Sequence, residues 1–442
     1  MSTVDRRAAL KLLASFAATL PVGSVAWSRP SAAPSINAAR LQQSLEELSK
    51  FGRRVGGSFA DGVSRVAYSD ADIAGRAYAM QLMREAGLST TIDAAGNLTG
   101  RYPGSDRSLK PIVMGSHIDT VPSGGNFDGN VGSMAAIEVV HTLKNQQILT
   151  RHPLEVVLWS NEEGDAMGSI AAVGDAPSEF GDTNSKAGIA VREGLRRIGG
   201  NPDRLSQARR APGSIHCYLE LHVEQGGILD KAGIPVGVVD GIVGIDSYEV
   251  TIEGFANHSG TTPMPMRHDA LLAASKIVEA VNDIATAEPG RQVATVGKLD
   301  VTPNAVTIVP GMVRLSIEIR DLSAEKVAKL GAAIAKRADQ IAADTQTSIA
   351  MKRVYHLDPA LADPALQAKI ESAAAGLGFA TMHLPSGAGH DAQNLSKIGP
   401  MAMIFVPSVG GVSHSPKELT RWKDCANGAN MLLRTLLAVD QS

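Results

Sequence analysis

Residues 115–129, GSHIDTVPSGGNFDG, place one histidine and two aspartates among glycines and other turn-forming residues. His117 follows the apolar run 112–114 after two small residues, Asp119 comes shortly after it, and Asp128 follows a glycine-rich segment. Because glycine and aspartate are common in turns, a purely structural loop is one interpretation. Imidazole nitrogens and carboxylate oxygens are also the ligands that zinc prefers. The glycines would let the backbone turn so that His117 and Asp128 reach the same ions.

Three further strand-like runs lead into residues of the same chemistry. These apolar runs are 154–159, 215–221 and 401–406. Each polar residue alone could be an ordinary loop residue, but the carboxyl ends of parallel strands share one edge of a sheet, where open α/β sheets bind ligands. We therefore expect a single metal-binding rim. Its predicted ligands are His117, Asp128, Glu163, His222 and His414.

This ligand set suggests a pair of divalent ions. If Asp128 bridges them, each ion also receives a further pair of protein ligands and a shared water. Two Zn²⁺ ions outweigh the charges of Asp128 and Glu163, which leaves a cationic centre that favours hydroxide and an anionic substrate. Zinc is the expected metal, with manganese, cobalt or nickel as alternatives.

Two carboxylates beside these ligands have separate expected roles. Glu162 and Glu163 are adjacent after a strand end, so their side chains cannot point the same way. Glu163 can bind metal while Glu162 faces the water as general base. Asp119 is expected to hold the second nitrogen of His117 and so fix its tautomer.

The elements that must position these residues are predicted to form an α/β fold. From about Ser35 the chain alternates short apolar runs with longer helical patterns, which predicts a mainly parallel sheet covered by helices. Between 246 and 356 the order becomes β-α-β-β-α-β, as in a small ferredoxin-like domain. Because His414 returns to the rim afterwards, we interpret this segment as an insertion. The predicted catalytic domain comprises 34–245 and 357–442.

Composition excludes several classes of partner. The 442-residue chain has a net charge of -3, which provides no basic surface for nucleic acid. Its two cysteines, Cys217 and Cys425, are too few for a disulfide framework. No segment after the N-terminal leader offers the roughly 18 consecutive apolar residues that a membrane span needs, so no membrane partner is expected for the mature form.

Residues 1–33 have the architecture of an export signal. Arg6 and Arg7 precede an apolar stretch, and small residues suited to cleavage follow it. The paired arginines are similar to a twin-arginine signal, although Ala9 stands where that pattern prefers phenylalanine. We expect 1–33 to be a signal peptide and the mature protein to be periplasmic or secreted. The alternative is an uncleaved amphipathic leader.

Taken together, these motifs resemble the M20-type metallopeptidase superfamily. Within it, the chain is most similar to the zinc-dependent amidohydrolases, which include N-carbamoyl-L-amino acid hydrolases, β-ureidopropionases and allantoate amidohydrolases. LHVEQG at 221–226 separates this group from the peptidases, which generally carry a carboxylate where His222 stands. The resemblance covers essentially the whole chain after the leader. It rests on 115–129, 160–164, 221–226, 256–270, 303–311, 317–321, 386–392 and 411–416.

The resemblance implies further roles. It assigns the five rim residues as metal ligands and Glu162 as the base, and it makes the inserted domain a lid and a dimer interface. Arg320 would bind a carboxylate, and His258 would donate to the oxyanion during catalysis. His390 is ambiguous, and 165–169 (DAMGS) departs from the Ser-Arg-Phe-like sequence usual in this group, so the substrate wall there is expected to differ. The implied substrate contacts are Gln225, His258, Asn304, Arg320 and Gly387.

The expected reaction is hydrolysis of the carbamoyl C–N bond of an N-carbamoyl-L-amino acid, which releases the amino acid, ammonia and carbon dioxide. The alternatives are an allantoate amidohydrolase, a β-ureidopropionase, a dipeptidase or aminoacylase on the same scaffold, and a binding protein without catalysis. His222 argues against the peptidase and Glu162 against the binding protein. We also expect a homodimer, because the inserted domain leaves an edge strand free. The resemblance implies that His258 and Asn304 act across it.

Overall fold

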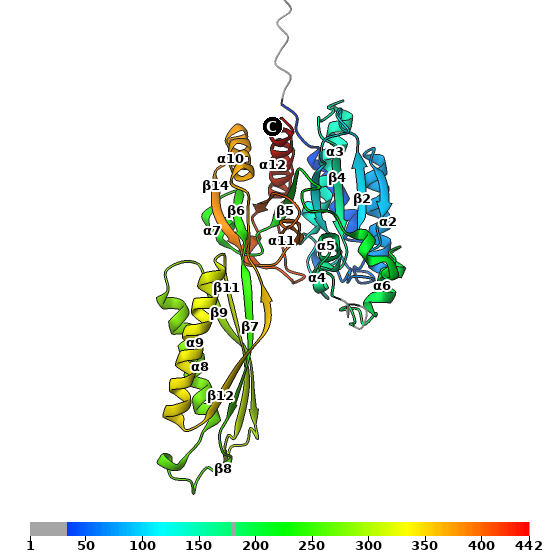
Figure 1. Ribbon diagram of the computed structural model, residues 1–442. Coiled ribbons are helices and arrows are strands. Elements are labelled where there is room, and N and C mark those ends of the chain that lie inside the picture. Colours follow the sequence, from blue (N-terminus) through cyan, green and yellow to red (C-terminus); the bar gives the residue numbers. More distant parts are fainter. Residues whose placement is uncertain (1–32, 178–179, 181–182, 442) are drawn as a thin grey trace, which may run out of the picture. The chain divides into compact units, whose positions relative to one another are not determined.

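Two large β-sheets organise the computed structural model, which describes residues 33–177, 180 and 183–441 (Figure 1). Apart from Ala33, the predicted export signal lies outside the described residues. Among the helices of the described ranges, none is both long and apolar enough to cross a membrane.

The larger sheet has nine strands within the described chain, in the order β1-β2-β4-β3-β5-β15-β6-β13, with β14 paired to β6. Its central strands run parallel to one another, and antiparallel pairs of β2 with β4 and of β6 with β15 join the outer strands to them. The central strands are β4 (Leu154–Trp159), β3 (Ile112–His117), β5 (Cys217–Val223) and β15 (Met401–Val406). The outer strands are β1 (Ser89–Ile92), β2 (Leu98–Tyr102), β6 (Val236–Ile242), β13 (Ala360–Leu361) and β14 (Thr381–Ser386).

Helices cover both faces of this sheet, which explains why the central strands are continuous apolar runs. Successive side chains of a strand point to opposite faces, so Ile112 and Met114 lie in one core and Val113 in the other. One face carries α1 (Ala38–Leu48), α2 (Asp70–Glu85), α3 (Asn130–Asn145), α10 (Pro364–Leu377) and α12 (Trp422–Asp440). The other carries α5 (Met167–Val173), α7 (Ile228–Ala232) and α11 (Asp391–Leu395). Short helices α4 (Glu162–Asp165) and α6 (Val191–Arg197) follow β4 and precede β5. The predicted α/β fold is confirmed.

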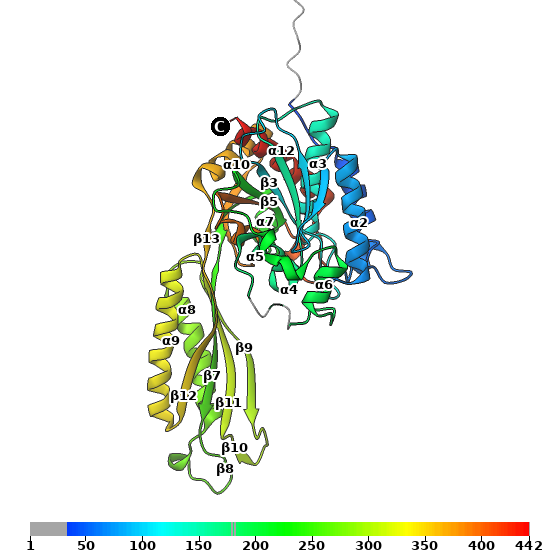
Figure 2. The ribbon, with the colours of Figure 1, turned by 45° about the vertical axis from the view of Figure 1, so that its right-hand side comes forward.

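The inserted segment forms a four-stranded antiparallel sheet with the order β12-β7-β11-β9. Two helices pack on one face of it (Figure 2). Its elements follow the predicted order β-α-β-β-α-β, and a two-stranded pair, β8 (Asn257–His258) with β10 (Ile308–Val309), is an addition that the sequence did not predict. The main elements are β7 (Gly244–Glu253), α8 (Ala270–Ala287), β9 (Val293–Thr302), β11 (Met312–Asp321), α9 (Ala324–Thr345) and β12 (Ser348–Leu357).

Candidate active site

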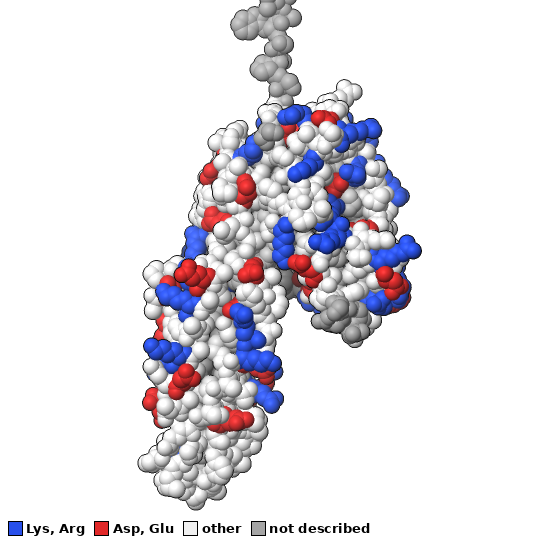
Figure 3. Space-filling view, viewed as in Figure 1, with Lys and Arg blue, Asp and Glu red and all other residues white. Residues whose placement is uncertain are grey.

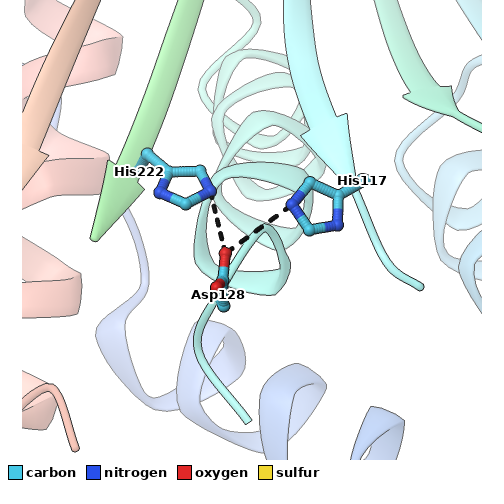
Figure 4. Close-up of side chains that lie close together, drawn as sticks. All are labelled: His117, Asp128 and His222. Carbon is cyan, nitrogen blue, oxygen red and sulfur yellow. Dashed lines mark ion pairs between the residues drawn. The ribbon is translucent and has the colours of Figure 1, made fainter. Parts of the chain in front are cut away.

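Asp128 lies at the centre of the predicted rim. His117 is the last residue of β3, His222 lies near the end of β5, and Asp128 precedes α3. Figure 4 shows both imidazoles pointing toward the Asp128 carboxylate. Asp128 Oδ1 is 3.1 Å from His222 Nε2 and 3.7 Å from His117 Nε2, and all three side chains are buried. The packing is tight, because a Cβ added to Gly129, whose φ is 63°, would lie 2.4 Å from the His117 ring.

The second oxygen of Asp128 faces a separate group of predicted ligands. Asp128 Oδ2 is 3.2 Å from His414 Nε2, and that nitrogen is 3.5 Å from Glu163 Oε1. Glu163 comes from α4 and His414 from the loop after β15, where it is half-exposed. The structure thus brings all five predicted ligands together as two groups of three that share Asp128.

Backbone carbonyls set the orientation of the two buried histidines. His117 Nδ1 is 3.0 Å from the carbonyl oxygen of Asp119, and His222 Nδ1 is 2.9 Å from that of Val223. When each Nδ1–H donates to its carbonyl, the lone pair of Nε2 faces Asp128. This is the tautomer that a metal-binding histidine needs.

The sequence predicted that the Asp119 carboxylate would bind His117 Nδ1, and this prediction is wrong. The nearest oxygen of this carboxylate is 3.9 Å from His117 Nδ1, beyond hydrogen-bonding distance, and the carbonyl of the same residue makes the contact instead. The carboxylate accepts hydrogen bonds from the backbone N–H groups of Glu162 (3.3 Å) and Glu163 (3.1 Å). These groups open α4 and have no acceptor within the helix, so a carboxylate is favoured there. Asp119 therefore positions the segment that carries the predicted base and one ligand.

Glu162 lies beside the ligands. Its Oε2 is 3.5 Å from His117 Nε2, and its side chain is 12% exposed. Burial, followed by the nearby carboxylates of Glu163, Asp119 and Asp128, raises its pKa well above the usual value. A carboxylate with a raised pKa next to a reaction centre suits a residue that accepts and returns a proton.

The charge balance of the rim fits divalent cations. Burial lowers the pKa values of His117 and His222, but the surrounding carboxylates outweigh it and raise both to about 9. The carboxylates around these two histidines therefore favour positive charge at the site. Divalent ions would supply this positive charge in place of protons. The donor set of imidazole nitrogens and carboxylate oxygens agrees with such ions.

A network around Asp128 includes residues that the sequence analysis did not identify. Glu418, which is buried, accepts hydrogen bonds from the backbone N–H groups of Phe127 (2.9 Å) and Asp128 (3.0 Å). Ser413 Oγ lies 2.9 Å from Glu418 Oε2 and 3.2 Å from Asp128 Oδ2. A Cβ on Gly125 would lie 2.2 Å from the Glu418 carboxylate. A lone glutamate in a loop carries no sequence signal that would have predicted this role. The feature nearest to it is the His414 motif, which Glu418 follows.

Two predicted substrate residues lie in the same cavity, which has a volume of about 390 Å³ and also contains the ligands and Glu162. Gln225 Nε2 donates to Asp128 Oδ2 at 2.9 Å, whereas its buried Oε1 has no hydrogen-bond partner. Arg320 Nη1 donates to the carbonyl of the predicted contact Gly387 at 2.6 Å, and Arg320 Nε donates to Glu318 at 2.8 Å. The cavity thus offers a guanidinium and an unused amide oxygen to a small substrate.

The other three predicted substrate residues, Gly387, His258 and Asn304, are not among the residues that line this cavity. In the inserted sheet Arg320 pairs with Ile245, at the end where the chain enters from β6. Met312 pairs with both Glu253 and Thr302, so the segments that continue to His258 and Asn304 start at the opposite end. At about 3.4 Å per residue, the ten-residue β7 separates the two ends by roughly 30 Å.

His390, which the sequence left ambiguous, lies behind His222. Their rings are 4.4 Å apart in an edge-to-face arrangement, and His390 Nε2 is 2.7 Å from Ser386 Oγ. Burial, together with the neighbouring His222, lowers the pKa of His390 well below its usual value, which disfavours the charged form of this imidazole. It packs against a ligand and contributes to the wall of the cavity.

Comparisons with known proteins identify the family of this chain. The N-carbamoyl-L-amino acid amidohydrolase of Geobacillus stearothermophilus is 39% identical over 411 residues, which cover 92% of this chain and 99% of that protein. The ureidoglycolate hydrolase of Arabidopsis thaliana is 34% identical, covering 91% of this chain and 86% of the relative. A solved structure of an amidase of the hydantoinase/carbamoylase family from Burkholderia multivorans superposes with a TM-score of 0.85 at 36% identity, covering 92% of this chain and 99% of the other. Residues 113–438 match the profile of Peptidase family M20/M25/M40, and the chain therefore belongs to this family.

Proposed function

We propose that this protein hydrolyses the carbamoyl C–N bond of N-carbamoyl-L-amino acids to the amino acid, ammonia and carbon dioxide. One observation carries the proposal: a single cavity contains two ligand groups that share Asp128, the carboxylate of Glu162 and the guanidinium of Arg320. Such a cavity suits a small substrate with a carboxylate at one end and a ureido group at the other. The name of the 39% identical relative supports the same reaction.

The two groups would hold two divalent metal ions. His117 and His222 would bind one ion and Glu163 and His414 the other, with Asp128 between them. When bound, such ions polarise a carbonyl oxygen and lower the pKa of water. We propose zinc as the metal, with manganese, cobalt or nickel as alternatives.

The side chains of the cavity would each have one task. Arg320 would bind the substrate carboxylate, since a guanidinium matches a carboxylate with two parallel hydrogen bonds. The free Oε1 of Gln225 would accept a hydrogen bond from the ureido N–H groups. Glu162 would take a proton from the attacking water and return it to the leaving nitrogen.

We further propose that a second copy of the chain completes the site. His258 and Asn304 lie at the end of the inserted sheet remote from Arg320, so they would serve the cavity of a neighbouring subunit. Figure 3 shows that this end, around β8, presents no charged side chains on the visible face. The exposed large apolar residues there are Phe255, Met264, Met266 and Val306. Strands β9 and β12 are the edges of the sheet and are available for pairing.

Substrate screening tests the proposed reaction. The metal-loaded protein is incubated with N-carbamoyl-L-amino acids, N-carbamoyl-β-alanine, allantoate, ureidoglycolate and dipeptides, and kcat/KM is measured for each. We expect the highest value for an N-carbamoyl-L-amino acid. The second candidate is a ureido acid such as ureidoglycolate or allantoate, because two relatives from Arabidopsis thaliana are named a ureidoglycolate hydrolase and an allantoate deiminase. A preference for dipeptides would overturn the proposal.

The location of the mature protein is a separate proposal. Arg6 and Arg7, followed by the apolar stretch of residues 1–33, support export and action in the periplasm or outside the cell.

A further inference from the structure

A second cavity, with a volume of about 620 Å³, adjoins the catalytic cavity. The two cavities share four wall residues, Glu162, Gly164, Gly389 and His390. A substrate that reaches Glu162 with its ureido group is therefore in contact with the entrance of the second cavity. None of the five predicted metal ligands lines the second cavity, which leaves it for another part of the substrate.

The walls of this second cavity are mainly apolar. Ala166, Met167 and Ile170 come from the segment of α4 and α5, where the sequence departs from the pattern usual in similar amidohydrolases. Ile245, Tyr355 and Leu357 come from the ends of β7 and β12 at the base of the inserted sheet. Together they form an apolar surface on two sides of the space.

The only charged side chains among the described wall residues are the carboxylates of Glu162 and Asp165. Asp165 accepts a hydrogen bond from Asn161 Nδ2 at 2.5 Å, which holds its carboxylate in the wall of the second cavity. No described lysine or arginine lines the cavity to balance an anionic group. A carboxylate-bearing side chain would meet like charges there, whereas an uncharged apolar side chain would bury its surface without that cost.

The covalent structure of the proposed substrate fits this arrangement. In an N-carbamoyl amino acid, three bonds separate the carbamoyl carbon from Cβ, and the carboxylate branches from the same α-carbon. If the carboxylate binds Arg320 and the ureido group lies beside Glu162, the side chain would reach the second cavity at Gly389 and His390, which line both cavities. A cavity of about 150 Å³ already holds benzene, so the available space accommodates a phenyl or branched aliphatic group.

We infer that this cavity is the subsite for the side chain of the substrate, and that it selects uncharged apolar side chains of the size of leucine, methionine or phenylalanine. The inference rests on the proposed hydrolysis of N-carbamoyl-L-amino acids and adds the class of side chain. It predicts that allantoate and N-carbamoyl-L-aspartate are poor substrates, because each would place polar or anionic groups against the apolar wall.

The test fills the cavity with a larger side chain. Ile170 is half-buried in its wall, and Ile170→Trp should lower kcat/KM for N-carbamoyl-L-phenylalanine by tenfold or more. The same variant should keep kcat/KM for N-carbamoylglycine within about threefold, because that substrate places no side chain in the cavity. Ile92→Trp is the matched control, since Ile92 is a partly exposed residue of β1 that does not line either cavity. Thermal unfolding of both variants measures any general loss of stability.

A binding experiment distinguishes the proposed side-chain subsite from the proposed reaction. Calorimetry with the metal-loaded Glu162→Gln variant, with and without Ile170→Trp, compares N-carbamoyl-L-phenylalanine with N-carbamoylglycine in the absence of turnover. Weaker binding of the phenylalanine compound alone supports the subsite even if a different bond is hydrolysed. Equal loss for both compounds, or wild-type preference for N-carbamoyl-L-aspartate or N-carbamoylglycine, would overturn the subsite. Failure of the wild type to hydrolyse any carbamoyl amino acid would overturn the reaction alone.

Discussion

At the rim of the large sheet, the five predicted ligands come from separate segments and meet, with Asp128 at their centre. In contrast, the predicted substrate residues of the inserted domain lie toward its two opposite ends. The rim residues are mostly buried and charged. His258 and Asn304 are exposed, whereas Arg320 lines the catalytic cavity and donates a hydrogen bond to Gly387. Parallel strands bring residues distant in sequence to one edge, while a long antiparallel sheet keeps its two ends apart. One chain therefore brings the predicted ligands together but does not bring all of the predicted substrate residues to the same cavity.

The largest expected effect comes from removing the centre of the rim. Asp128→Ala should lose activity and bound metal, because this carboxylate faces both ligand groups. Glu162→Gln is the matched comparison, since it should keep its metal and lower kcat by about 10²- to 10⁴-fold through loss of the proton acceptor. Elemental analysis of both purified variants, beside kcat, separates the two roles. Full metal content in Asp128→Ala would show that Asp128 does not bridge the ions.

The next effect tests whether the inserted sheet serves a second chain. His258→Ala and Glu162→Gln proteins are each expected to be inactive. After random exchange, an equimolar mixture should regain up to about a quarter of wild-type activity, because about half of the dimers are mixed and one of the two sites in each mixed dimer is intact. Arg320→Ala mixed with Glu162→Gln is the control and should not recover, because Arg320 and Glu162 line the same cavity of one chain. Subunit exchange is confirmed by differently tagged chains. No recovery of the His258 pair after exchange would place His258 in its own chain's site.

The smallest expected effect concerns Glu418, whose hydrogen bonds hold the backbone at Asp128. Glu418→Gln should weaken metal affinity by about 10- to 100-fold, as is usual when a residue that orients a ligand is changed. The amide oxygen can still accept from the N–H groups of Phe127 and Asp128, but the amide nitrogen cannot accept from Ser413. Calorimetric titration of the metal-free protein with Zn²⁺ measures the change. Glu371→Gln, which alters a surface contact with His383, is the control. Unchanged affinity in Glu418→Gln would mean that this network does not orient Asp128.

Much of the rim was predictable from the sequence because its signals are local. Each central strand is an apolar run followed by a polar residue of a particular type, and the rule that parallel strands end at one edge converts that order into proximity. The β-α-β-β-α-β order of the segments between 246 and 356 likewise predicted the inserted sheet and its helices. The two-residue strands β8 and β10 were not predicted, because they are too short to show the two-residue alternation of apolar and polar side chains.

The sequence by itself therefore determined the elements, the family and which residues meet at the rim, since these follow from residue type and periodicity. The tertiary structure alone decided that the Asp119 carbonyl, and not its carboxylate, holds His117, because the orphan N–H groups of α4 compete for the carboxylate. It also brought Glu418 to the backbone of Asp128, and the strand register placed His258 and Arg320 at opposite ends. These features depend on which groups become neighbours after folding, and no local pattern along the chain encodes that.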